Sequence, residues 1–113
     1  MADRELVELA AKAAGYEVAW NPHWNCLQHR YPQPDAAGRT RHPWVPLDDD
    51  GDALRLAAKL ELDVMHRVVG RKRIEVLPAG GPLFQYPYEG MDTAAAWRNA
   101  IVRAAAEIGK AMP

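Results

Sequence analysis

The clearest pattern of apolar and polar positions lies in the middle of the chain, over residues 44–62, WVPLDDDGDALRLAAKLEL. After the aspartates, apolar residues recur every three or four positions, which is the spacing that gives a helix one buried face. The positions on that face are Ala53, Leu56, Ala57 and Leu60. The pattern predicts a core helix that begins after the aspartates and is entered from a short strand at Trp44 and Val45.

The aspartates before this helix have two possible roles, and they are Asp48, Asp49, Asp50 and Asp52. A carboxylate there can cap the helix, because it accepts free amides of the first turn and suits the positive end of the helix dipole. The alternative is a calcium loop, but the fifth position counted from Asp50 is Leu54, which has no side-chain ligand. The residues therefore favour capping.

Two further helices are predicted near the ends of the chain. One runs from Asp3, as its cap, to Ala14 and ends at Gly15, with Leu6, Leu9, Ala10 and Ala13 on its apolar face. The other is capped by Asp92 and runs from Thr93 to about Ala111. Its predicted buried stripe is Trp97, Ile101, Ala104, Ala105 and Ile108, and Arg98, Asn99 and Glu107 are expected to face water.

The segments between the first two helices predict extended structure. Residues 16–20, YEVAW, alternate at period two and are interpreted as a strand. Residues 23–31, HWNCLQHRY, are ambiguous and can form a second strand. Residues 32–42 contain two prolines and Gly38, which is typical of a loop.

The segment after the central helix reads as a hairpin. Residues 62–69 and 73–77 are the two strands, and Gly70, Arg71 and Lys72 form the tight basic turn between them. Residues 78–90, PAGGPLFQYPYEG, predict a long loop with at most a short extended piece at residues 83–86.

The order of these elements predicts the fold class. Most strands are joined by turns that are too short for a helical crossover, so the sheet should be mostly antiparallel. The expected fold is α+β, with about four strands and three helices packed on the sheet. A chain of 113 residues is expected to form a single domain over residues 1–113.

Composition narrows the functional classes. The net charge of −1 gives no basic excess, so general nucleic-acid binding is not expected. No apolar run approaches the length of a membrane span, and the N-terminal segment is charged and amphipathic, so we expect a cytoplasmic protein. The single cysteine, Cys26, cannot form an internal disulfide.

Residues for catalysis or metal binding are few. The chain has no serine, and we assign no catalytic residue and no cofactor. His23, Cys26 and His29 offer three ligands where structural zinc needs four, and on one strand the cysteine would point away from both histidines. We therefore assign no metal site, although a metal and a Cys–His dyad remain alternatives.

Aromatic and basic residues in or near the loops are the best candidates for a binding site. A nucleotide base gains roughly 1–3 kcal/mol by stacking on an aromatic ring. Guanidinium groups bind phosphate through two parallel hydrogen bonds. The candidate ligand-binding residues are Trp20, Trp24, Arg41, Trp44, Arg71, Arg73, Tyr86 and Tyr88. The alternative is that these tryptophans pack in the core and the arginines are solvated.

Two blocks of the sequence resemble small phage and prophage proteins of the phage ABA-sandwich type. WVPLDDDGDALRLAAKL is similar to their block W-N-P-L-x-D-D-G-D-A-L-R-L-A-x-K-L, with Val45 in place of Asn. TAAAWRNAIVRAAAEIGKAM is similar to their block A-I-V-R-A-A-A-E-I-G, although residues 94–97 differ from its usual start. The blocks cover about a third of the chain. The resemblance implies a phage origin and an α/β sandwich, and it carries over no catalytic residue.

Some small phage proteins of this size sequester nucleotide-derived signals of bacterial defence systems such as Thoeris and CBASS, and they are typically homo-oligomers. By that analogy we expect a non-enzymatic phage accessory protein that binds a small nucleotide-type ligand in the cytoplasm of an infected bacterial host. A homo-oligomer with pockets between subunits is expected. The alternative is a protein-binding module that inhibits or adapts a host protein, and a nucleotide hydrolase is a third hypothesis.

Overall fold

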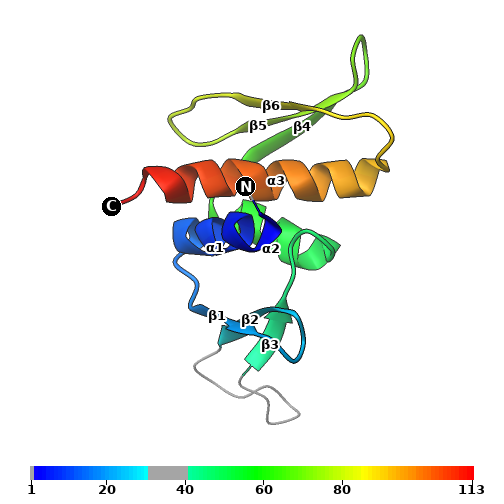
Figure 1. Cartoon of the computed structure of the whole chain (residues 1–113). Helices are drawn as coiled ribbons and strands as arrows, with labels where there is room; N and C mark the ends of the chain where they lie inside the picture. Colours follow the sequence, from blue (N-terminus) through cyan, green and yellow to red (C-terminus); the bar gives the residue numbers. More distant parts are fainter. Residues whose placement is uncertain (1, 31–40) are drawn as a thin grey trace.

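The computed structural model describes residues 2–30 and 41–113, which form three helices and six strands (Figure 1). The helices are Asp3–Ala14 (α1), Asp50–Lys59 (α2) and Thr93–Ala111 (α3). The strands are Val18–Asn21 (β1), Cys26–Arg30 (β2), Arg41–Trp44 (β3), Asp63–Arg67 (β4), Arg73–Leu77 (β5) and Phe84–Pro87 (β6).

The helices form a layer between two antiparallel sheets. Strands β1, β2 and β3 form one sheet and β4, β5 and β6 form the other, each in sequence order. Figure 1 shows the two sheets on opposite sides of the helices, with α3 beside the second sheet and α1 and α2 nearer the first. The α+β class is confirmed, but the expectation of about four strands in one sheet is corrected to three strands in each of two sheets.

Helix α3 is the centre of this layered arrangement, because it is buried on two sides. Ile101, Val102 and Ala105 belong to the core shared with α1, α2 and the first sheet. Ala96, Ala100 and Ala104 belong to a second core with the inner face of β5. Because alanine side chains are small, other elements can approach α3 closely from both sides. A helix with a single apolar stripe could pack against other elements on one side only.

The ends of α1 differ in part from the prediction. Gly15 ends the helix in the left-handed conformation, at φ 73°, as predicted. The N-cap is Ala2, which gives no side-chain hydrogen bond, so Asp3 is the first helical residue and not the cap. The buried positions are Ala10, Ala11 and Ala14, and the half-buried residues Leu6 and Leu9 flank them.

The aspartate cluster caps α2, as expected. The carboxylate of Asp49 accepts the backbone N–H of Asp52 at 2.7 Å. The carboxylate of Asp52 accepts the backbone N–H of Val45 at 3.0 Å, and it also pairs with Arg55 at 2.7 Å. These bonds tie the segment after β3 to the first turn of the helix.

Helix α3 has the predicted bounds and the predicted cap, because Asp92 accepts the N–H of Ala95 at 2.9 Å. The expectation that Arg98 faces water is wrong. Its Nε donates to the backbone carbonyl of Leu47 at 2.9 Å, and its NH1 pairs with Asp50 at 2.6 Å. Arg98 therefore joins α3 to the start of α2.

The structure also describes parts of both predicted loops. Within residues 78–90, the short extended piece predicted at residues 83–86 corresponds to β6, which pairs with β5 from Arg73–Pro87 to Val76–Phe84. Of the predicted loop over residues 32–42, residues 32–40 lie outside the described part of the chain, and residues 41 and 42 belong to β3.

Candidate functional site

The eight candidate ligand-binding residues divide between two distant places. Trp20, Trp24, Arg41 and Trp44 belong to the first sheet and its turns, and Arg71, Arg73, Tyr86 and Tyr88 belong to the second sheet and its turns. The helix layer separates these two sheets (Figure 1). Within one chain the structure therefore does not bring the eight residues together at one site.

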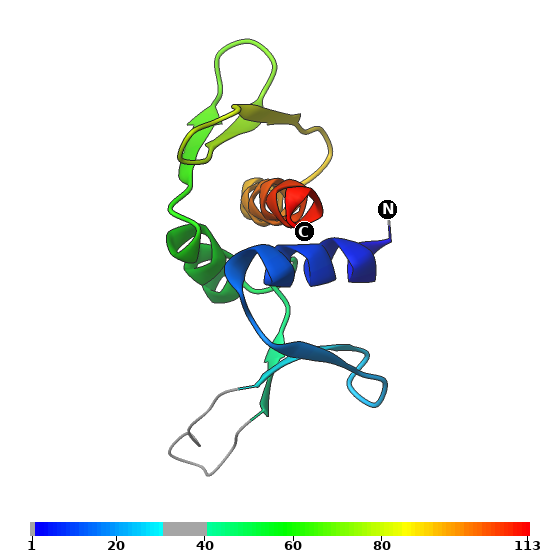
Figure 2. The same ribbon diagram turned by 90° about the vertical axis from the view of Figure 1, so that its left-hand side faces the viewer.

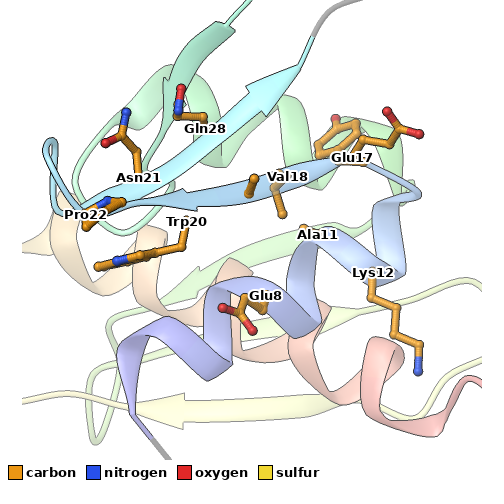
Figure 3. A pocket seen from close by; sticks show the side chains of 11 residues that line it. Glu8, Ala11, Lys12, Glu17, Val18, Trp20, Asn21, Pro22 and Gln28 are labelled. Atoms are coloured by element: carbon orange, nitrogen blue, oxygen red, sulfur yellow. The ribbon is translucent and has the colours of Figure 1, made fainter.

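A cleft of about 810 Å³ lies between α1 and β1, and we call it the Trp20 cleft. It is lined by Glu8, Ala11, Lys12, Tyr16, Glu17, Val18, Ala19, Trp20, Asn21, Pro22 and Gln28. Figure 3 shows the Trp20 ring in the space between β1 and α1, with Glu8 on the facing helix and Lys12 further along it. A volume of this size is in the range of small-molecule sites.

A guanidinium group already lies on the face of the Trp20 ring. The Arg4 Cζ lies 4.5 Å from the ring centroid, which is a cation–π contact. The Arg4 Nε also pairs with Glu8 at 2.8 Å, and both side chains remain about half exposed. One face of the ring therefore already holds a flat group, and that group is about half exposed.

The charges around the cleft are mixed. Glu8 and Glu17 contribute carboxylates, whereas Lys12 contributes an ammonium group that donates to the backbone carbonyl of Met112 at 3.1 Å. Asn21 and Gln28 also line the cleft, but Figure 3 shows their amides on the opposite side of β1 from the Trp20 ring. The Asn21 Oδ1 accepts the backbone N–H groups of His23 at 2.9 Å and Trp24 at 3.2 Å. This lining suits a flat group with hydrogen-bonding edges better than it suits a bare phosphate.

The other two tryptophans of the first sheet differ in exposure. Trp44 is only 4% exposed, and its ring packs edge to face on Tyr16 with centroids 5.6 Å apart. It is a core residue of this fold and offers no free face for stacking. Trp24 lies in the β1–β2 turn and is 46% exposed, and it is not among the residues that line the Trp20 cleft.

The basic candidates have different surroundings. Arg41 is in β3, where it pairs with Arg30, and its side chain lies outside the described part of the structure. Arg71 is exposed in the β4–β5 turn and shares a small pocket of about 380 Å³ with Tyr88. Arg73 lies on β5, where its Nε approaches Glu75 at 3.4 Å.

Glu75 explains why Arg73 is less suitable for an anionic ligand. A hydrogen bond from Arg67, at 2.8 Å, is the main reason that the pKa of the Glu75 carboxyl is below its ordinary value, and Arg73 acts in the same direction. Glu75 is therefore a carboxylate at neutral pH and competes for both arginines.

The two tyrosines of the second sheet are also engaged. The Tyr88 hydroxyl lies 2.6 Å from His66 Nε2 and 3.5 Å from Thr93 Oγ1. The Tyr86 ring carries the Arg103 guanidinium on its face, with Cζ 4.5 Å from the centroid. Burial raises the pKa of Tyr86 to about 12, and its hydroxyl has no hydrogen-bond partner among the described residues.

Sequence reasoning missed Glu8 and Gln28 as residues of the Trp20 cleft and Arg4 as the residue on the Trp20 ring. The four-residue spacing of Arg4 and Glu8 predicts an ion pair on one helix face, which the structure contains. That local spacing gives no sign that the pair lies beside Trp20, because the contact depends on how β1 packs against α1. Gln28 carries no sequence signal of its own.

The possible metal and nucleophile residues do not form a centre. His23 is in the β1–β2 turn, whereas Cys26 and His29 are in β2 at positions of opposite parity. Among residues 2–30 and 41–113, no three His, Cys, Asp or Glu side chains are placed to hold a metal ion together. Burial raises the pKa of the Cys26 thiol, which disfavours the reactive thiolate.

Comparisons with protein families, curated proteins and solved structures found no match to this chain. In the described part of the chain, no helix is both long enough and apolar enough to cross a lipid bilayer.

Proposed function

We propose that the protein binds and sequesters a small nucleotide-type ligand in the Trp20 cleft without transforming it. The observation that carries the proposal is the Trp20 ring between β1 and α1, in a cleft of about 810 Å³ with Glu8 and Lys12 on the facing helix. Stacking on an aromatic ring is the general means by which proteins hold nucleobases. The shortage of catalytic groups supports binding over catalysis.

The contact between Arg4 and Trp20 indicates how the ligand is held. A nucleobase is flat like a guanidinium group, so it can take the place of Arg4 on the ring. The Arg4 side chain is about half exposed, so the displaced guanidinium group can pair with a phosphate of the same ligand.

The analogy with small phage proteins that sequester defence signals suggests an anti-defence role for such binding. In this role the protein lowers the concentration of a nucleotide-derived signal in the cytoplasm of an infected bacterial host. We propose that it acts as a homo-oligomer, which presents several binding sites in one particle.

Sequestration is tested with AMP, cyclic di-AMP and cyclic ADP-ribose as probes. Each probe is incubated with the protein, the free fraction is measured by chromatography after ultrafiltration, and the protein is then heat-denatured. The expected result is depletion of at least one probe, followed by its intact release on heating. No depletion of any probe overturns the proposal, and release of a changed product supports the hydrolase hypothesis in its place.

The position of the site is tested with matched tryptophan variants. Trp20→Leu should weaken probe binding at least tenfold, because it removes the stacking surface and keeps an apolar side chain. Trp24→Leu is the control, because Trp24 is exposed outside the cleft. Arg4→Ala should weaken binding of AMP but not of adenosine, because only AMP carries the phosphate. Equal effects of the two tryptophan variants would place the ligand elsewhere.

A second candidate function is binding to a host protein, and the tip of the β4–β5 hairpin favours it. Val69 is 87% exposed and Val68 is 57% exposed, next to the basic residues Arg71 and Lys72. Exposed apolar groups beside positive charge are typical of a protein contact. A stoichiometric partner recovered by wild-type protein and lost with Val69→Asp supports this function, and a partner retained by that variant argues against the hairpin tip.

A further inference from the structure

One side of the molecule combines an outer strand with an outer helix. Within the described sheets, β4 is a terminal strand and pairs only with β5. The edge of a terminal strand presents backbone N–H and C=O groups that can pair with another strand. Figure 2 shows β4 and α2, both green, along the same side of the molecule, with α1 and α3 further from that side.

An apolar groove of about 470 Å³ lies along this edge, between α2, α3 and β4. Val64 lines it from β4 and Trp97 lines it from α3. Leu54 lines it from α2 and is 69% exposed, which leaves a large apolar side chain in water. An open strand edge beside an apolar groove is the arrangement that receives an added strand.

The side chains of β4 point alternately towards α3 and away from it. Val64 packs in the core and the His66 ring contacts Trp97, so both face inward. Arg67 pairs with Glu75 on the outer face of the sheet, and Asp63 and Met65 share that face by the period of two. Residues directly opposite each other in an antiparallel pair share a face.

We propose that the groove and edge are a dimer interface, on which β4 of a second copy of this chain pairs antiparallel with β4 across a two-fold axis. Residues opposite each other share a face, so each residue of β4 must pair with one that lies an even number of positions away in the sequence. One residue therefore lies opposite its own copy at the two-fold axis, and the central choices for it are Val64, Met65 and His66. The axis through Met65 places Asp63 of each copy opposite Arg67 of the other. Within β4, residues 63–67, the axes through Val64 and His66 give no such pairing of opposite charges, so charge complementarity within the strand selects Met65.

The charges can form these pairs without losing the contacts already present. Arg67 uses its Nε for Glu75, at 2.8 Å, and a guanidinium group has five N–H donors. Asp63 is exposed on the same outer face. By symmetry the dimer contains two Asp63–Arg67 pairs, and opposite charges directly across an antiparallel pair are stabilising.

The same axis brings the α2 helices of the two copies together. The helices lie on one side of the second sheet, and a two-fold axis perpendicular to the sheet keeps them on that side in both copies. Leu54 and Ala58 are exposed one turn apart on α2, at the rim of the groove, so they meet their counterparts across the axis. Burial of these apolar groups adds to the strand pairing.

This inference specifies the self-association included in the proposed function, and its test requires no ligand. Met65→Cys is prepared in a Cys26→Ser background and oxidised. Opposite residues of an antiparallel pair lie about 4.5–5.5 Å apart at Cα, which is within the range of a disulfide. We therefore expect a disulfide-linked dimer on a non-reducing gel, and the wild type should sediment as a dimer in analytical ultracentrifugation.

Two variants control for register and for random collision. Asp63→Cys in the same background should remain unlinked, because this register separates the two copies of residue 63 by several residues. Asp63→Lys should raise the dimer dissociation constant at least tenfold, whereas Glu89→Lys, the same change of charge away from β4, should leave it unchanged.

A wild-type protein that sediments as a monomer across the concentration series overturns the dimer. Equal cross-linking of the two cysteine variants overturns the register. Because probe binding to the Trp20 cleft is measured separately, failure of the dimer and failure of the proposed function are distinguishable.

Discussion

Gly109 of α3 lies directly against the backbone carbonyl of Leu9 in α1. A Cβ at Gly109 would overlap the Leu9 oxygen and would lie 2.9 Å from the Leu9 carbonyl carbon. It would also lie 3.3 Å from the backbone nitrogen of Ala13. These neighbours are backbone atoms of a helix, which cannot move away as a flexible side chain can. The close packing of α1 on α3 therefore depends on the missing side chain at position 109.

Gly109→Ala should consequently destabilise the protein, although alanine is normally the better helix former. Forcing a methyl group into a packed interface typically costs about 1–3 kcal/mol, which exceeds the helix-propensity gain of about 1 kcal/mol. The free energy of unfolding is measured by urea denaturation. Gly51→Ala in α2 is the matched control, because its Cβ would meet the flexible ends of Arg55 and Asp49 at 3.2 Å. A stability of Gly109→Ala equal to or above wild type would contradict the close approach of the helices.

Arg98 provides the second test of how the helices are joined. Its side chain is 18% exposed, whereas the side chain of its ion-pair partner Asp50 is 76% exposed. An exposed ion pair contributes at most about 1 kcal/mol. Removal of a donor from a half-buried carbonyl costs about 1–3 kcal/mol, and Arg98 is the donor to Leu47. Arg98→Ala should therefore lower the free energy of unfolding more than Asp50→Ala does. Equal losses would show that the ion pair with Asp50 is the main contribution.

The sequence predicts those parts of the fold whose signals are local. The bounds of α3, its Asp92 cap and the strand at residues 73–77 agree with the structure, because each is defined by a cap, a turn or a period within a few residues. The short extended piece predicted at residues 83–86 agrees with β6, but its pairing with β5 was not predicted. As a terminal strand, β6 can contain a proline, which lacks the backbone N–H. The division into two sheets depends on contacts between distant segments, which no local pattern specifies.

The same limit applies to the candidate site. Trp20 and Trp44 both lie on short strands of the first sheet, yet one lines a cleft and the other is core. Which of the two is exposed depends on where α1 and α2 cover the sheet. Arg98 was expected in water for a related reason, because its place on the polar side of α3 does not show that the start of α2 lies beside it.

Asp49 should behave as a helix cap and not as a metal ligand. Its carboxylate accepts the N–H of Asp52 at 2.7 Å, so Asp49→Ala should lower the free energy of unfolding by about 1 kcal/mol. Asp48→Ala is the control, because Asp48 is exposed just before the cap and should change stability by less than about 0.5 kcal/mol. Both variants are compared in urea denaturation with and without calcium chloride. A rise in wild-type stability with calcium that Asp49→Ala abolishes would revive the calcium-loop interpretation.

Tyr86 makes the stability of the protein dependent on pH in the alkaline range. Burial raises the pKa of Tyr86 to about 12, above the ordinary value of 10.0. The unfolded chain therefore loses this proton at lower pH than the folded chain does. The contribution of protonated Tyr86 to the free energy of unfolding is fully present below pH 10 and is lost as the pH rises towards 12. Tyr86→Phe should remove this part of the alkaline decline in stability.

The two states of Tyr86 can be followed directly by ultraviolet titration of the phenol groups. Tyr86→Phe should remove an ionisation near pH 12, and Tyr88→Phe should retain it because Tyr86 is still present.

At neutral pH, Tyr86→Phe should leave stability unchanged or raise it by up to about 1 kcal/mol, because the hydroxyl is buried without a partner among the described residues. The cation–π contact with Arg103 uses the ring and survives the change. A clear loss of stability at neutral pH would instead show that the Tyr86 hydroxyl makes a hydrogen bond in solution, with water or with another group.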